Sequence, residues 1–135
     1  MSCTSRTDCV AVGDYAHRRA GGTLPLAEQW NGVSWAIQQT PTPAGEKDSE
    51  LDGISCTTAT ACTAVGSFTN RARTRATLAE RWNAVTWAIQ HTPTLARGDD
   101  SWLNRVSCTT PTACTAVGSA TTHAGITRPL AERYR

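Results

Sequence analysis

The segment SCTTATACTAVG (Ser55–Gly66) occurs two more times in the chain in closely similar form. It returns as SCTSRTDCVAVG (Ser2–Gly13) and as SCTTPTACTAVG (Ser107–Gly118). Counted from serine to serine, the first two copies are offset by 53 residues and the last two by 52. A fixed period of this length is the sequence signature of a repeat architecture. The chain is therefore expected to fold as an array of similar units.

A second motif follows each copy of the first. LAEQW at Leu26–Trp30 returns as LAERW at Leu78–Trp82 and as LAERY at Leu130–Tyr134. The first two units continue with an Asn and a second Trp, as WNGVSW and WNAVTW. The 135 residues thus form one repeat array of about 2.6 units. We expect the units at about 2–50, 51–101 and, incomplete, 102–135.

Composition and charge argue against several classes of function. The net charge of +2 is too small to indicate nucleic-acid binding, and no run approaches the roughly 18 apolar residues needed to span a bilayer. The N-terminal residues lack the apolar core of a signal peptide. Because the chain begins inside a repeat motif, we expect it to derive from a longer array or to begin at an added methionine.

The six cysteines form three pairs with five residues between the members of each pair. This spacing, in register with the repeat, predicts one local disulfide per unit and a location outside the reducing cytoplasm. Zinc is the weaker alternative, because structural zinc sites prefer two to four residues between cysteines and no histidine has a repeated position. A redox pair would more often be C-x-x-C beside a helix. The expected bridges are Cys3–Cys9, Cys56–Cys62 and Cys108–Cys114.

Strand patterns fill each unit, and no stretch keeps helical periodicity over two turns. In the second unit we expect strands at Leu51–Thr57, Ala61–Phe68 and Arg75–Trp82, and a fourth that ends in Trp87–Gln90. The disulfide would join the first two strands into a hairpin. Each complete unit is therefore expected to form a four-stranded antiparallel sheet.

The dipeptide Asn31-Gly32 predicts a two-residue turn between the third and fourth strands of the first unit. In that register Glu28 lies opposite Trp35, and strand alternation separates large residues from small ones. The expected small-residue face carries Ala27, Gln29, Ser34 and Ala36, and the large-residue face carries Leu26, Glu28, Trp30, Val33, Trp35 and Ile37.

Four short antiparallel strands in a unit of about 52 residues are typical of a β-propeller blade. The unit resembles the blades of bacterial, especially actinomycete, extracellular β-propeller repeat proteins, whose pattern is Ser-Cys…Cys-x-Ala-Val-Gly followed by Leu-x-Glu-x-Trp-Asn-Gly-x-x-Trp. The resemblance covers essentially the whole chain and implies an all-β propeller. A closed propeller has typically four to eight blades. The ring would be completed by a homo-oligomer, a dimer or trimer, or by sequence outside this chain. A β-trefoil, which also has three four-stranded repeats, is the alternative fold.

A repeated acid–indole pair is the main candidate for a binding site. Glu28 with Trp35 and Glu80 with Trp87 occupy matching positions, and the third unit supplies Glu132. A carboxylate accepts hydroxyl hydrogen bonds and an indole stacks on the C–H faces of a sugar, so the pair suits carbohydrate binding. In the other interpretation the glutamates are buried and hold the repeats in register, in which case each carboxylate needs a partner.

Residues that differ between units provide a second kind of candidate. Trp102 stands at the position that Glu50 occupies one repeat earlier. An exposed Trp at this position would be a ligand platform or an interface anchor, and simple packing is the alternative.

The sequence contains no Gly-x-Ser-x-Gly, no His-Glu-x-x-His, no phosphate-binding loop and no histidine in a repeated position. The first functional hypothesis is a non-catalytic, secreted, lectin-like module without cofactor or metal. The second is a structural or protein-interaction propeller, or a fragment of a longer one. A glycoside-active enzyme that uses paired carboxylates is the third.

Overall fold

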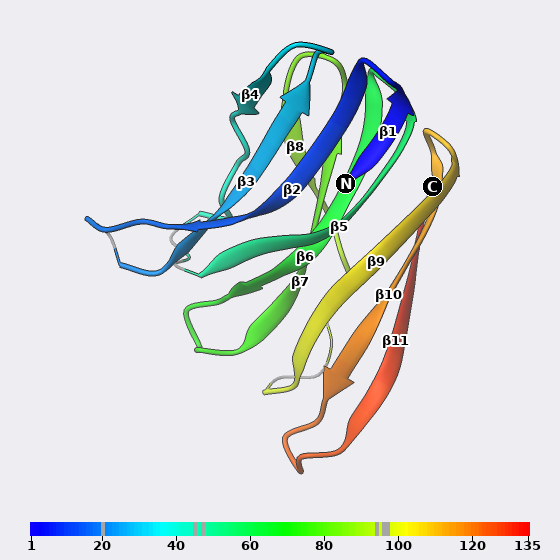
Figure 1. Cartoon of the computed structure of the whole chain (residues 1–135). Coiled ribbons are helices and arrows are strands. Elements are labelled where there is room, and N and C mark those ends of the chain that lie inside the picture. Colours follow the sequence, from blue (N-terminus) through cyan, green and yellow to red (C-terminus); the bar gives the residue numbers. More distant parts are fainter. Residues whose placement is uncertain (20, 45, 47, 94, 96–97) are drawn as a thin grey trace.

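The computed structural model describes residues 1–19, 21–44, 46, 48–93, 95 and 98–135. Within them the chain is all-β, as expected, and no helix occurs (Figure 1). The strands expected in the second unit are confirmed to within two residues at each end. The described strands are β1 (Ser2–Ser5), β2 (Asp8–Ala16), β3 (Thr23–Trp30), β4 (Trp35–Gln38), β5 (Ser49–Thr58), β6 (Ala61–Thr69), β7 (Arg75–Trp82), β8 (Trp87–Gln90), β9 (Asp100–Thr110), β10 (Ala113–Thr121) and β11 (Thr127–Tyr134).

The strands form three antiparallel sheets, and strands that are consecutive in sequence are neighbours in each sheet. Sheet 1 contains β1–β4, sheet 2 contains β5–β8 and sheet 3 contains β9–β11. Figure 1 shows sheet 2 between the other two. In the described part of the chain, each repeat therefore forms the backbone ladder of its own sheet and of no other.

The predicted register of the third and fourth strands is wrong. Trp30 pairs with Trp35, and Glu28 pairs with Ile37 rather than with Trp35. The connection thus has four residues where two were expected. A shift of two residues keeps every strand residue on its original face, because side chains alternate with a period of two. The large-residue and small-residue faces of the hairpin therefore persist in the structure.

An asparagine side chain explains the longer turn. The Oδ1 of Asn31 accepts hydrogen bonds from the backbone N–H of Val33 and of Ser34, both at 2.9 Å. This Asx arrangement closes four residues instead of two. Asn83 makes the same two bonds in the second unit. Val33 and Ser34, which were expected in the strand, belong to the turn.

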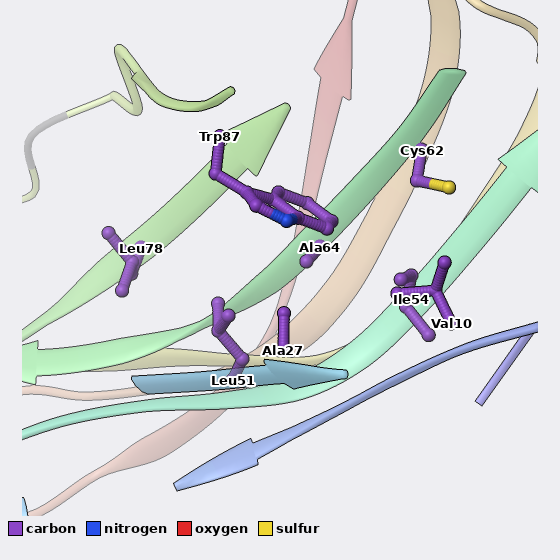
Figure 2. Close-up of a cluster of buried hydrophobic side chains, with 8 residues drawn as sticks. All are labelled: Val10, Ala27, Leu51, Ile54, Cys62, Ala64, Leu78 and Trp87. Carbon is purple, nitrogen blue, oxygen red and sulfur yellow. The ribbon is translucent and has the colours of Figure 1, made fainter. Parts of the chain in front are cut away.

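The sheets stack face to face, and the core of the molecule lies between them. The large-residue face of sheet 2, with Leu78 and Trp87, packs on the small-residue face of sheet 1, with Val10 and Ala27 (Figure 2). The large-residue face of sheet 3 packs in the same way on the small-residue face of sheet 2. The buried residues of this second interface are Val65, Ala79, Leu103 and Ala116.

A repeated hydrogen bond also joins adjacent sheets. The hydroxyl of Ser2 in sheet 1 accepts a hydrogen bond of 3.0 Å from the backbone N–H of Cys56 in sheet 2. The hydroxyl of Ser55 accepts the corresponding bond, also 3.0 Å, from Cys108 in sheet 3. The serine of the Ser-Cys-Thr motif in each of the first two repeats thus links its sheet to the next one.

The three expected disulfides are confirmed. In each repeat the two cysteines lie directly opposite each other on the first and second strands, so the bridge closes the end of a hairpin. The bridges are Cys3–Cys9, Cys56–Cys62 and Cys108–Cys114.

Among the described residues, no helix has the length and apolar character needed to cross a membrane.

Candidate binding faces and the repeated Glu–Trp pairs

Glu80 lies in the interior between sheets 1 and 2. It follows Leu78 by two residues on β7 and pairs with Ala64 and Ile89, so its side chain is on the large-residue face that sheet 1 covers. The residue has 0% exposed surface, and neither carboxylate oxygen has a hydrogen-bond partner among the described residues. Burial raises the pKa of Glu80 to about 8, because the charged form loses its hydration.

Trp87, the aromatic partner expected for Glu80, is also buried. Only 5% of its surface is exposed, and its ring contacts Trp82, with 5.7 Å between the centroids. The indole Nε1 donates a hydrogen bond of 2.9 Å to Oε1 of Gln38, which belongs to β4 of sheet 1. The polar atom of this indole is therefore used to join two sheets.

Glu132 occupies the matching place between sheets 2 and 3. It is 5% exposed, and its Oε2 accepts a hydrogen bond of 2.6 Å from the hydroxyl of Tyr134. Burial and this bond raise the pKa of the Tyr134 phenol. The third repeat thus supplies a donor to its glutamate, because it has Tyr where the second repeat has Trp82.

Glu28 and Trp35 lie on the large-residue face of sheet 1, which no other sheet covers in the described structure. Trp35 is 44% exposed, and its ring packs only partly, against Trp30 at 5.7 Å between the centroids. Glu28 is half-buried. The three glutamates therefore have one position in the repeat and differ in access, because sheets 2 and 3 have a neighbour on this face and sheet 1 has none.

Trp102 lies half-buried on β9, and its ring faces a cation. The guanidinium carbon of Arg75 is 5.8 Å from the centroid of the indole, within the range of a cation–π contact. The same guanidinium donates a hydrogen bond of 2.8 Å to Oε1 of Glu50. Arg75 thus holds together the two different residues, Glu50 and Trp102, that stand at equivalent positions of successive repeats.

Arg75 and Gln38 are the contact residues that sequence reasoning missed. Arg75 is the first residue of β7, as expected for the third strand, but the sequence gave no sign of its ion pair with Glu50. For Gln38, the recurrence of Trp-Ala-Ile-Gln in both complete repeats was the available signal.

The described surface has several clefts, and two of them lie near the residues discussed above. One, of about 620 Å³, lies beside the ends of β7 and β8 and has a mainly apolar lining that includes Phe68, Leu78 and Ile89. The other, of about 600 Å³, is polar and is lined by Asp52, Asn104, Arg105, Val117 and Gly118. Burial, with a smaller contribution from Glu50, raises the pKa of Asp52.

In the described part of the chain, no group of three or more His, Cys, Asp or Glu side chains is arranged to hold a metal ion. Comparison with known proteins gives no match: no family model matches the chain, and no curated protein or solved structure is similar enough to count as a match.

Proposed function

We propose that this chain is a non-catalytic β-propeller-type repeat module that binds a protein partner through the open faces of its outer sheets. One observation carries the proposal: burial closes the Glu80–Trp87 pair and Glu132, while Trp35 remains accessible on sheet 1. A sugar cannot reach a carboxylate with no exposed surface, so the buried glutamates act as parts of the scaffold. Exposed aromatic side chains beside apolar ones are typical of protein interfaces.

The strand pairing supports a propeller rather than a β-trefoil. In a propeller each blade is a separate sheet of about four antiparallel strands, and blades pack face to face. The described strands pair only within their own repeat, and adjacent sheets meet through side chains. We propose blades at residues 2–38, 49–90 and 100–134, the third with three strands.

Secretion is part of the same proposal. Three disulfides are typical of proteins that work outside the reducing cytoplasm. They also suit a thin stack of sheets, because each bridge stabilises a unit that has little core of its own.

Site-specific cross-linking tests the proposed interaction. A photoreactive phenylalanine at position 35 is expected to capture a protein partner when the protein is secreted into the medium. The same group at position 85, in the exposed turn of sheet 2, is the matched control and is expected to capture none. Equal capture at the two positions, or capture at neither, would contradict the proposal.

Carbohydrate binding on the open face of sheet 1 is the second candidate. The exposed ring of Trp35 on the same face as half-buried Glu28 favours it, because this repeat alone leaves both groups within reach of a ligand. On a glycan array, binding that disappears in Trp35→Ala and persists in Val85→Ala would support this candidate over a protein partner. The absence of binding to every glycan would exclude it.

A further inference from the structure

The two outer faces of the stack are the halves of an interface that the molecule already contains twice. On sheet 3, Val117 is 46% exposed, whereas the equivalent Val65 of sheet 2 is fully buried by sheet 3. On sheet 1, Trp35 is exposed, whereas the equivalent Trp87 is buried by sheet 1 itself. The open face of sheet 1 is thus a large-residue face that no small-residue face covers. The open face of sheet 3 is a small-residue face that no large-residue face covers.

The residues of the open small-residue face match those of a covered one. Ala131 and Val117 repeat the pair Ala79 and Val65, which pack on sheet 3 within the chain. Thr115 likewise repeats Thr63, whose hydroxyl lies 3.4 Å from the sulfur of Cys114 across the interface. Both Ala131 and Thr115 are exposed.

The serine link between sheets is also left open at one end. Ser2 and Ser55 each accept a backbone hydrogen bond from the cysteine of the following repeat. Ser107, the third member of the series, is exposed. The cysteine in the corresponding place of a docked sheet 1 would be Cys3 of a second molecule.

Arg105 is the main departure from this match. It stands at the position of Gly53, where an added Cβ would lie 2.7 Å from the carbonyl oxygen of Asn104 in the next sheet. Arg105 is exposed on the open face. A docked sheet 1 therefore has to leave space there for a side chain that the interface between sheets 2 and 3 does not contain.

We propose that the open face of sheet 1 docks on the open face of sheet 3 of a second copy, repeating the two internal interfaces from molecule to molecule. This inference rests on the proposed function and names the partner. The contact is heterologous, because it joins two different surfaces. When two molecules have docked, one open face of sheet 1 and one open face of sheet 3 are still free. Copies therefore add head to tail until the ring closes.

Two single-face variants test this arrangement by native mass spectrometry and sedimentation velocity. Wild type is expected to form oligomers of more than one chain. Trp35→Arg removes the sheet 1 face and Val117→Arg the sheet 3 face, so each variant alone is expected to be monomeric. Val85→Arg places the same charge on an exposed turn away from both faces and should assemble as wild type does.

Mixing the two monomeric variants gives the decisive measurement. Each retains the face that the other has lost, so an equimolar mixture is expected to form a heterodimer and nothing larger. Circular dichroism checks that both are folded, and Ala131→Arg replaces Val117→Arg if that variant is not.

Three results would overturn the proposal. One is assembly of Val117→Arg alone, which would mean that the sheet 1 face docks on itself. Another is a mixture that remains monomeric. The last is wild type that remains monomeric at all concentrations; capture of a different protein through position 35 would then overturn self-docking alone and leave the proposed function standing.

Discussion

The carboxyl group of Glu80 lies between two sheets without a hydrogen-bond partner among the described residues. Its pKa of about 8 in the folded protein is well above the ordinary value of 4.5. Between these two values the folded state binds more protons than the unfolded state, so stability is greatest at acidic pH and falls as pH rises. Above about pH 8 the buried carboxyl group is ionised, and the full loss of stability is present.

Glu80→Gln is expected to remove this pH dependence. The amide has nearly the same shape and carries no charge, so the fall in the free energy of unfolding, up to roughly 5 kcal/mol from pH 4.5 to pH 9 in wild type, should largely disappear. Urea unfolding at several pH values measures it. Glu28→Gln, on the uncovered face, is the control and should leave the wild-type dependence in place. If the free energy of unfolding of Glu80→Gln falls with pH as steeply as that of wild type, Glu80 is not the source of the pH dependence.

Gly66 shows why the Ala-Val-Gly motif ends in glycine. An added Cβ would lie 2.0 Å from the carbonyl oxygen of Glu50, a backbone atom of the adjacent strand that cannot move aside easily. Gly66→Ala is expected to lower the free energy of unfolding by about 3 kcal/mol. The matched control is Gly13→Ala, because no atom lies within 4 Å of its added Cβ. Its effect should stay within about 0.5 kcal/mol. Equal urea midpoints for the two variants would contradict this explanation.

At the scale of elements, the turns between the third and fourth strands share a left-handed residue. Gly32 has φ of 93° in the first repeat, and Ala84 has φ of 77° in the second. An alanine in this region is strained by contacts of its Cβ, whereas glycine is not. The two turns therefore have one geometry and differ in the strain that they contain.

Ala84→Gly is expected to stabilise the protein by about 0.5–1 kcal/mol, the relief of strain minus the added entropy of the unfolded chain. Ala88→Gly, in β8, is the control and should destabilise it by about 0.5–1 kcal/mol. Thermal unfolding of both variants measures the difference. A lower melting temperature for Ala84→Gly would show that the turn does not strain Ala84.

The same turns mark the limit of prediction from this sequence. The second-unit strands and all three disulfides followed from the pattern, because repetition supplies each signal more than once. The register of the third and fourth strands did not follow from it, since an Asn-Gly dipeptide also occurs in two-residue turns. The four-residue turn is favoured by the hydrogen bonds to the Asn31 side chain. Burial of the repeated glutamates was one of two interpretations of the sequence, but the sequence could not distinguish Glu80 from Glu28. Burial depends on which face a neighbouring sheet covers, and Glu28 has the same local sequence with a different neighbour.

At the scale of the whole molecule, the disulfides contribute a large share of stability. Closing a ring of about seven residues contributes roughly 2–3 kcal/mol, so three bridges amount to roughly 6–9 kcal/mol, against the 5–15 kcal/mol typical of a folded protein. A reducing agent at neutral pH is therefore expected to leave the chain largely unfolded. Far-ultraviolet circular dichroism with and without reductant measures this. A reduced chain that keeps the full strand signal would contradict the estimate.

The pairing of each repeat with itself has a consequence for how such a chain can change over generations. A duplicated or deleted stretch of DNA that encodes one repeat adds or removes a whole sheet together with its own disulfide, and breaks no backbone ladder. The new sheet meets its neighbours through faces that already fit them. Unequal recombination would therefore lengthen or shorten the array without an intermediate that fails to fold, and the close similarity of the Ser-Cys-Thr segments is what such a history would leave behind.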